Sequence, residues 1–135
     1  MIDATAFYLA TNPTRFDVIV TMNQYGDILS DLCAGLVGSL GLGAGANIGD
    51  QCSVFEACHG SAPDIAGQNK ANPIATILSA AMMLRYSLNL DEEADAVEAA
   101  VQKVLTDGYR TGDIMSDGCK AIGTKEMGDL IAAAV

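Results

Sequence analysis

Two aspartates four residues apart, Asp27 and Asp31, are the pair in this sequence best suited to bind a metal ion. A helix is predicted over 27–40, and residues four apart project from the same helical face. The two carboxylates would repel each other, and no basic residue lies within one helical turn of either. A divalent cation that prefers oxygen ligands, Mg²⁺ or Mn²⁺, would relieve that repulsion. The alternative is that Asp27 only caps the helix and Asp31 faces solvent.

The single histidine, His59, opens a loop of small residues, HGSAPDIAG, that runs to Gly67. Ser61 and Asp64 lie close to it in sequence, but no nucleophile elbow surrounds Ser61, so we set hydrolase chemistry aside. A lone histidine is also often a hydrogen-bonded structural residue. The glycine-rich stretch 41–49, GLGAGANIG, has the spacing of neither a dinucleotide fingerprint nor a phosphate-binding loop, and we interpret it as a flexible connection.

Helices and strands that alternate along the chain must position these residues. Apolar residues at helical spacing predict helices, and β-branched runs bounded by turn residues predict strands. Asn72-Pro73 is a typical helix start, because asparagine caps a helix and proline is tolerated in its first turn. The patterns predict helices at 3–11, 27–40, 73–88, 92–107 and 124–135, and strands at 16–21 and 53–57. This alternation indicates an α/β fold, and two strands are too few for a complete sheet.

Composition narrows the choice of partners and location. Seventeen acidic residues against seven basic ones give a net charge of −10, which leaves too few cations for binding nucleic acid or an anionic membrane surface. No signal-peptide pattern or membrane-spanning apolar run is present. Four scattered cysteines without a CxxC pair indicate reduced thiols and a cytoplasmic protein. The predicted helix at 27–40 is apolar around most of its circumference, which predicts burial against a second subunit.

Two long motifs resemble those of a known enzyme family. NQYGDILSDLCAGLVGSLGLGAGANIG covers residues 23–49, and FEACHGSAPDIAGQNKANP covers residues 55–73. This combination resembles the isocitrate and isopropylmalate dehydrogenase family, whose members are NAD(P)-dependent oxidative decarboxylases of 2-hydroxy acids. The first motif looks most similar to NAD-dependent isocitrate dehydrogenases. The alternatives are 3-isopropylmalate and homoisocitrate dehydrogenases.

The resemblance implies a two-domain α/β fold with a long central sheet, of which this chain would be the C-terminal part. Residues 1–37 would belong to the small, dimer-forming domain, and residues 38–135 to the large cofactor-binding domain. The helix that carries Asp27 would then lie in the subunit interface. The protein is therefore expected to be a homo-oligomer, at least a dimer.

The same resemblance implies the residues of two sites. Asp27 and Asp31 match metal-binding aspartates, and Asp3 matches a third that reaches the metal from the neighbouring subunit. Glu56 matches a residue near the nicotinamide end of the cofactor. The residues that match the segment around the adenosine half of NAD are His59, Gly60, Ser61, Ala62, Asp64, Ile65 and Asn72.

The resemblance also implies a choice between the two nicotinamide cofactors. A carboxylate at Asp64 would accept hydrogen bonds from the ribose hydroxyls and would repel the 2′-phosphate of NADP. Family members that use NADP tend to carry Lys and Tyr where this chain has Asp64 and Ile65. We therefore expect NAD as the cofactor.

The family's substrate-binding arginines, general-acid tyrosine and catalytic lysine have no match here and lie upstream in the family pattern. Arg15 is the only basic residue among the first 69, although a di- or tricarboxylate substrate needs cationic partners. We therefore expect the isolated chain to lack turnover and to supply metal and adenosine sites to a metal- and NAD-dependent dehydrogenase. The rival hypothesis is a truncated, catalytically incomplete module for nucleotide binding or dimerisation.

Overall fold

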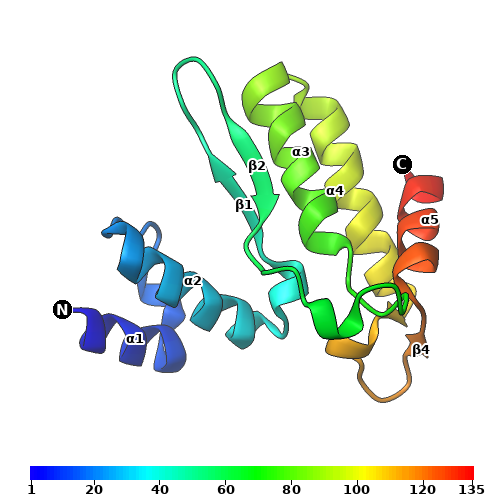
Figure 1. Cartoon of the computed structure of the whole chain (residues 1–135), viewed down its shortest axis with the longest axis horizontal. Helices are drawn as coiled ribbons and strands as arrows, with labels where there is room; N and C mark the ends of the chain where they lie inside the picture. The colour runs from blue at the N-terminus through cyan, green and yellow to red at the C-terminus, as the bar shows by residue number, and fades with distance from the viewer.

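The computed structural model describes residues 1–135, which form helices, short strands and brief 3₁₀ turns (Figure 1). The helices are α1 (Ile2–Thr11), α2 (Asn23–Val37), α3 (Ile74–Leu88), α4 (Asp91–Thr106) and α5 (Thr124–Ala134). The strands are β1 (Ala44–Asn47), β2 (Val54–Ala57), β3 (Tyr109–Arg110) and β4 (Lys120–Ala121), and the 3₁₀ turns are η1 (Pro13–Arg15), η2 (Leu40–Leu42), η3 (Pro63–Ile65) and η4 (Gly112–Ile114). The helices lack the combination of length and apolar character that crossing a bilayer would require.

Helix α3 is the central element of a stack that contains most of the buried residues (Figure 1). One side of α3 contacts the β1–β2 hairpin and the other side contacts α4, which in turn packs against α5. The buried hydroxyl of Ser79 joins the hairpin to α3. It donates to the carbonyl of Ala75 at 2.8 Å and accepts from the backbone N–H of Gly45 at 3.3 Å. This stack confirms the predicted mixture of helices and strands.

The core is built from small and branched side chains rather than aromatic ones. Ala75 and Ala81 on α3 and Ala94 on α4 have no exposed surface. Small side chains at these positions allow neighbouring helices to approach closely. The main buried cluster comprises Ile74, Ala100, Val101, Val104, Met127 and Ile131.

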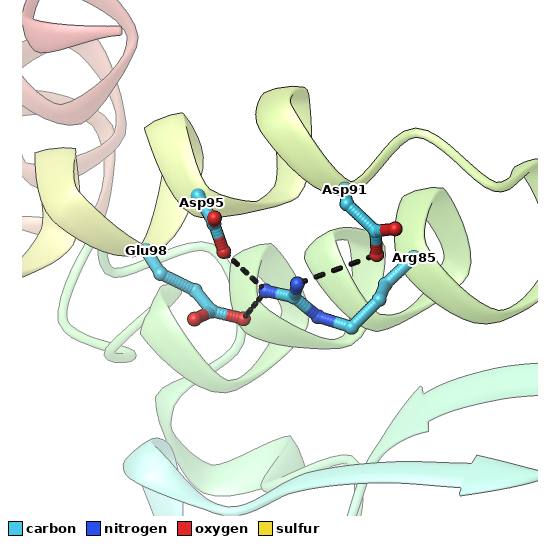
Figure 2. A network of polar contacts seen from close by, with 4 residues as sticks. All are labelled: Arg85, Asp91, Asp95 and Glu98. Carbon is cyan, nitrogen blue, oxygen red and sulfur yellow. Dashed lines mark hydrogen bonds and ion pairs between the residues drawn. The ribbon is translucent and has the colours of Figure 1, made fainter.

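At the solvent side of the same helix pair, Arg85 of α3 reaches three carboxylates of α4 (Figure 2). Its guanidinium nitrogens lie 2.9 Å from Asp95, 2.9 Å from Glu98 and 3.5 Å from Asp91. Exposed ion pairs individually contribute little to the free energy of unfolding. Because one guanidinium group pairs with carboxylates on successive turns of α4, however, the contacts together favour one register between α3 and α4.

Helices α1 and α2 pack on each other at the opposite end of the molecule from α5 (Figure 1). Only Leu9 is buried on α1, and only Leu29 and Ala34 are buried on α2. Exposed large apolar side chains gather on these helices and on the segment between them: Ile2, Phe7, Tyr8, Val18, Ile19, Val20, Met22, Tyr25, Ile28, Leu36 and Val37. An apolar surface of this kind is typical of an interaction site. Burial of this face against a second subunit stays a prediction.

The predicted helices are confirmed, with shifted ends. α1, α3, α4 and α5 begin and end within one residue of the predicted ranges. α2 begins at Asn23, four residues before the predicted start, and ends before Gly38, whose φ of +132° a side-chain-bearing residue rarely adopts. The side-chain oxygen of Asn72 accepts from the N–H of Ile74 at 3.0 Å, as expected at a helix start.

One of the two predicted strands is confirmed and the other is wrong, and β1, β3 and β4 were not predicted. Residues 53–57 contain β2, but residues 16–21 form no strand, because a β-branched run becomes one only when a neighbour takes its backbone hydrogen bonds. The glycine-rich stretch, interpreted as a flexible connection, instead forms part of η2 and all of β1. β1 is antiparallel to β2, with Ala44 opposite Ala57 and Asn47 opposite Val54. Residues 109–123, for which no helix or strand was predicted, contain the parallel pair β3–β4.

Replacement of Met127 by alanine should strongly destabilise the fold. Met127 has no exposed surface and lies in the core cluster, and truncating a buried methionine costs about 2 to 5 kcal/mol. Met115, which is 44% exposed, provides the matched control, and Met115→Ala should change the free energy of unfolding by less than about 0.5 kcal/mol. Urea denaturation of the variants measures both values. Equal effects of the two substitutions would contradict this description of the core.

Candidate functional site

A cavity of about 680 Å³ lies where the loop after β2, the beginning of α3 and the beginning of α5 meet. Its volume is within the range of small-molecule and cofactor pockets. Six of the eight residues predicted to bind the cofactor line it: His59, Gly60, Ser61, Ala62, Ile65 and Asn72. Polar residues that the sequence did not reveal also line it, among them Lys70, Asp113, Thr124 and Lys125.

The loop that forms one wall of the cavity is held in an uncommon conformation. Ala62 has a φ of +41°, in the left-handed region where an alanine side chain is strained. Such strain is often found at binding sites, where the surrounding structure fixes it. After η3 the loop is closed by Gln68, whose side-chain amide donates to the carbonyl of Asp64 at 2.7 Å. The His59 ring nitrogen Nδ1 lies 2.9 Å from the carbonyl of Gly60.

Asp113, from η4, is bonded to two other parts of the cavity region. Its Oδ2 atom accepts from the hydroxyl of Ser39 at 2.5 Å and from the side-chain amide of Asn72 at 3.1 Å. Burial alone raises the pKa of Asp113, but hydrogen bonds from side chains including Ser39 and Asn72 outweigh burial and hold this pKa below its usual value. Asp113 therefore remains a carboxylate at neutral pH.

Gly41 permits the close contact between η2 and this network. A Cβ atom at Gly41 would lie 2.7 Å from the Cβ atom of Asn72 and 3.0 Å from Oδ2 of Asp113. Any side chain at residue 41 would therefore force η2 away from the start of α3. The cavity wall at Gly41 depends on the absence of a side chain.

The beginning of α5 is fastened to the segment just before α3. Asn69 accepts from the N–H of Thr124 at its backbone carbonyl, at 3.1 Å, and from the N–H of Lys125 at its side-chain oxygen, at 2.9 Å. The hydroxyl of Thr124 donates to the carbonyl of Ala71 at 2.5 Å. These bonds place α5 at the edge of the cavity, and they satisfy N–H groups that a helix start leaves free.

The two predicted metal-binding aspartates lie one turn apart on α2, and both are exposed. Because α2 begins at Asn23, Asp27 is inside the helix and does not cap it, so the capping alternative is wrong. Neither carboxylate forms an ion pair in this chain. Asp3 lies on α1, and the chain brings no three acidic, histidine or cysteine side chains together as a metal cluster.

Cys58 directly follows β2, and its thiol is influenced by carboxylates of both β2 and α2. Its pKa is raised by burial and by the negative charges of Asp31 and Glu56. The thiol donates to the carbonyl of Ala44 at 3.4 Å. Asp31 and Glu56 are thus near the residue that precedes His59, while Glu56 itself does not line the cavity.

Asp64 is the second predicted cofactor residue that the cavity does not include. It lies in η3 between residues that do line the cavity, and its carboxylate has no salt-bridge partner. The placement of Asp64 near a ribose therefore stays a prediction.

The residues present are suited to both groups that the resemblance implies. The cavity combines an imidazole ring, apolar atoms and a few polar side chains, which is the composition of an adenosine site. Magnesium is commonly held by one or two protein carboxylates with water and substrate oxygens completing its shell. Asp27 and Asp31, exposed and unpaired, can provide such a pair of ligands.

Comparison with known proteins shows the same family along almost the whole chain. The family model described as isocitrate/isopropylmalate dehydrogenase matches residues 1–131. The chain is 57% identical over 135 residues to a 3-isopropylmalate dehydrogenase of Cupriavidus pinatubonensis, covering 99% of this chain and 38% of that protein. It is 58% identical to a 3-isopropylmalate dehydrogenase of Aquifex aeolicus, covering 96% of this chain and 36% of that protein.

The fold leads to the same family. The crystal structure of isocitrate dehydrogenase from Methylococcus capsulatus superimposes with a TM-score of 0.93 at 48% identity, covering 98% of this chain and 39% of that one. The chain thus spans less than two fifths of the length of these relatives. The chain belongs to the isocitrate/isopropylmalate dehydrogenase family.

Proposed function

We propose that this chain supplies the cofactor and metal sites of an NAD-dependent dehydrogenase that oxidatively decarboxylates a 2-hydroxy di- or tricarboxylate. The observation that carries the proposal is that six motif residues, predicted from the sequence to bind adenosine, converge on one cavity. When bound, NAD would accept the hydride, and Mg²⁺ or Mn²⁺ would polarise the substrate's oxygen atoms.

In this proposal the cavity holds the adenosine half of the cofactor. The His59 ring offers a flat surface for the base, and the small residues Gly60, Ser61 and Ala62 allow the backbone to approach the ligand. Asn72 is 7% exposed and bonded to Asp113, so its amide is held in a fixed orientation at the cavity edge. A fixed donor of this kind favours specific binding, because little rotamer freedom is lost when the ligand binds.

Asp27 and Asp31 have a different task in the proposal. The substrate is an anion, so two carboxylates without a cation would repel it. A divalent cation between them and the substrate reverses that repulsion. Asp3 would complete the site from a second subunit, and the exposed apolar face on α1 and α2 would form the contact between subunits. The division between the small and large domains would then fall at Val37 and Gly38, where α2 ends.

The available observations favour two different substrates. The first sequence motif and the superimposed crystal structure favour isocitrate, whereas the curated relatives named above are 3-isopropylmalate dehydrogenases. Assay of the full-length protein with isocitrate, 3-isopropylmalate and homoisocitrate decides between them. The chain alone should show no turnover, since it lacks the family's substrate arginines. A cytoplasmic location is part of the proposal and rests on the scattered cysteines of the sequence.

Replacement of His59 by alanine should weaken nucleotide binding. Loss of a base–ring stack costs about 1 to 3 kcal/mol, so the Kd for NAD should rise roughly tenfold. Isothermal titration calorimetry on the full-length protein measures this change. Tyr86→Ala removes an exposed aromatic ring outside the cavity and should leave the Kd unchanged. An unchanged Kd in His59→Ala would exclude the stacking arrangement.

Removal of one carboxylate from α2 should weaken metal binding. Asp27→Asn and Asp31→Asn should each lower Mn²⁺ affinity by at least about tenfold, because each removes one of the carboxylates that attract the cation. Electron paramagnetic resonance of free Mn²⁺ during titration of the full-length protein provides the measurement. Asp17→Asn, which changes the net charge equally at another exposed position, should have no such effect. Equal losses in all variants would indicate only a nonspecific charge effect.

The full-length enzyme should prefer NAD to NADP by roughly tenfold or more in kcat/KM, because Asp64 disfavours a nearby phosphate charge. Asp64→Lys combined with Ile65→Tyr should shift the preference toward NADP. Asp50→Lys, an equal change of charge in the β1–β2 connection, should not do so. Equal or better use of NADP by the unchanged enzyme would refute the role of Asp64.

A further inference from the structure

We infer that Ser39, a residue outside the cavity, is a positioning residue for the dinucleotide site: its hydroxyl fixes both Asp113 and Gly41, two residues that line the cavity. This inference rests on the proposed function, because the cavity is taken to bind the cofactor. Ser39 itself is not among the residues that line the cavity.

The hydroxyl of Ser39 acts both as a hydrogen-bond acceptor and as a hydrogen-bond donor. It accepts a hydrogen bond from the backbone N–H of Gly41 at 3.0 Å and donates to Oδ2 of Asp113 at 2.5 Å. A hydroxyl has a single proton to donate, so the bond to Asp113 determines its orientation. The lone pair that faces Gly41 is then fixed as well.

A simple capping role does not account for this arrangement. Ser39 precedes η2, and its bond to Gly41 is sufficient to cap that turn. The second bond reaches a carboxylate 74 positions further along the chain, on η4. A hydrogen bond to a charged acceptor is stronger than one between neutral groups, so this second contact is the stronger of the two. Its effect is to join η2 to η4 across the cavity edge.

The start of α3 is held by the same carboxylate oxygen. Oδ2 of Asp113 also accepts from the amide of Asn72 at 3.1 Å, and the place where Gly41 meets Asn72 leaves no room for a side chain. Loss of the Ser39 hydroxyl would free η2 to move and would leave Asp113 with one fewer donor. The Ser39 hydroxyl thereby joins η2 to η4, and Asp113 joins both to the start of α3.

Ser39 also lies close to the end of α2, the helix that carries the proposed metal ligands. Ser39 follows Gly38, which directly follows the end of α2. The helix that carries Asp27 and Asp31 is therefore joined to the nucleotide cavity at the residue that Asp113 holds. The bond from Ser39 to Asp113 fixes the end of this connection that lies beside the cavity.

The test compares Ser39→Ala with Ser39→Thr in the full-length protein, with Ser87→Ala as the control. Ser87 is an exposed serine on α3 away from the cavity. Ser39→Ala should raise the Kd and the KM for NAD roughly three- to tenfold, the effect of losing one charge-assisted hydrogen bond, while kcat changes less than about twofold. Ser39→Thr keeps the hydroxyl and should restore the affinity. Ser87→Ala should match the unchanged protein.

A second measurement follows the stability of the cavity wall at Gly41 by hydrogen exchange. Hydrogen exchange of the Gly41 amide should accelerate in Ser39→Ala and in Asp113→Asn, and it should not in Ser39→Thr or Ser87→Ala. In the double variant Ser39→Ala/Asp113→Ala the loss of NAD affinity should be smaller than the sum of the two single losses, because both single variants remove the shared Ser39–Asp113 bond. If the unchanged protein binds NAD and Ser39→Ala binds it equally well, the inference about Ser39 is overturned while the proposed function stands. If the unchanged protein binds no NAD, the proposed function fails and the inference fails with it.

Discussion

Close packing of α3 against its neighbouring elements, with fully buried alanines on α3 and α4, is the constraint on which the remaining structure depends. Fully buried Ala75, Ala81 and Ala94 leave no room for larger side chains between neighbouring elements, so the helix positions are fixed by contact rather than by flexible side chains. The hairpin packs on the other side of α3, and α5 packs on α4. The cavity lies at one end of this stack, where the starts of α3 and α5 are fastened to each other through Asn69. Its shape follows from the helix packing.

The sequence was sufficient to predict the helices of this stack and part of the cavity. Periodic apolar residues and the Asn72-Pro73 start predicted α3, and the motif after β2 predicted one wall of the cavity. The opposite wall was not predicted, because Asp113, Thr124 and Lys125 are distant in sequence and only folding brings them to the cavity. No local pattern around Asp113 distinguishes it from the exposed acids of α4. Tertiary contacts alone reveal its bonds to Ser39 and Asn72.

Backbone pairing explains the errors in the strand predictions. Residues 16–21 have the composition of a strand but no neighbouring strand to bond with in this chain, so they form no strand, and residues 17–21 are exposed. β1 has the opposite character: its sequence is AGAN, which has little strand propensity, yet it pairs with β2 through its backbone. Propensity measures how well side chains fit a sheet, whereas strand formation needs a partner. The exposed apolar side chains on α1 and α2 likewise have no covering surface within this chain.

The surroundings of Cys58 have a chemical consequence. A thiol reacts with oxidants and alkylating reagents as the thiolate, and burial together with Asp31 and Glu56 raises the pKa of this thiol. The thiolate fraction of Cys58 at neutral pH is therefore smaller than that of a free cysteine, although the residue is exposed and lies next to His59. Oxidants and alkylating reagents should therefore react more slowly with Cys58 than with an exposed cysteine whose pKa is not raised. Partial burial and the neighbouring acidic side chains thus both act against covalent modification of this thiol.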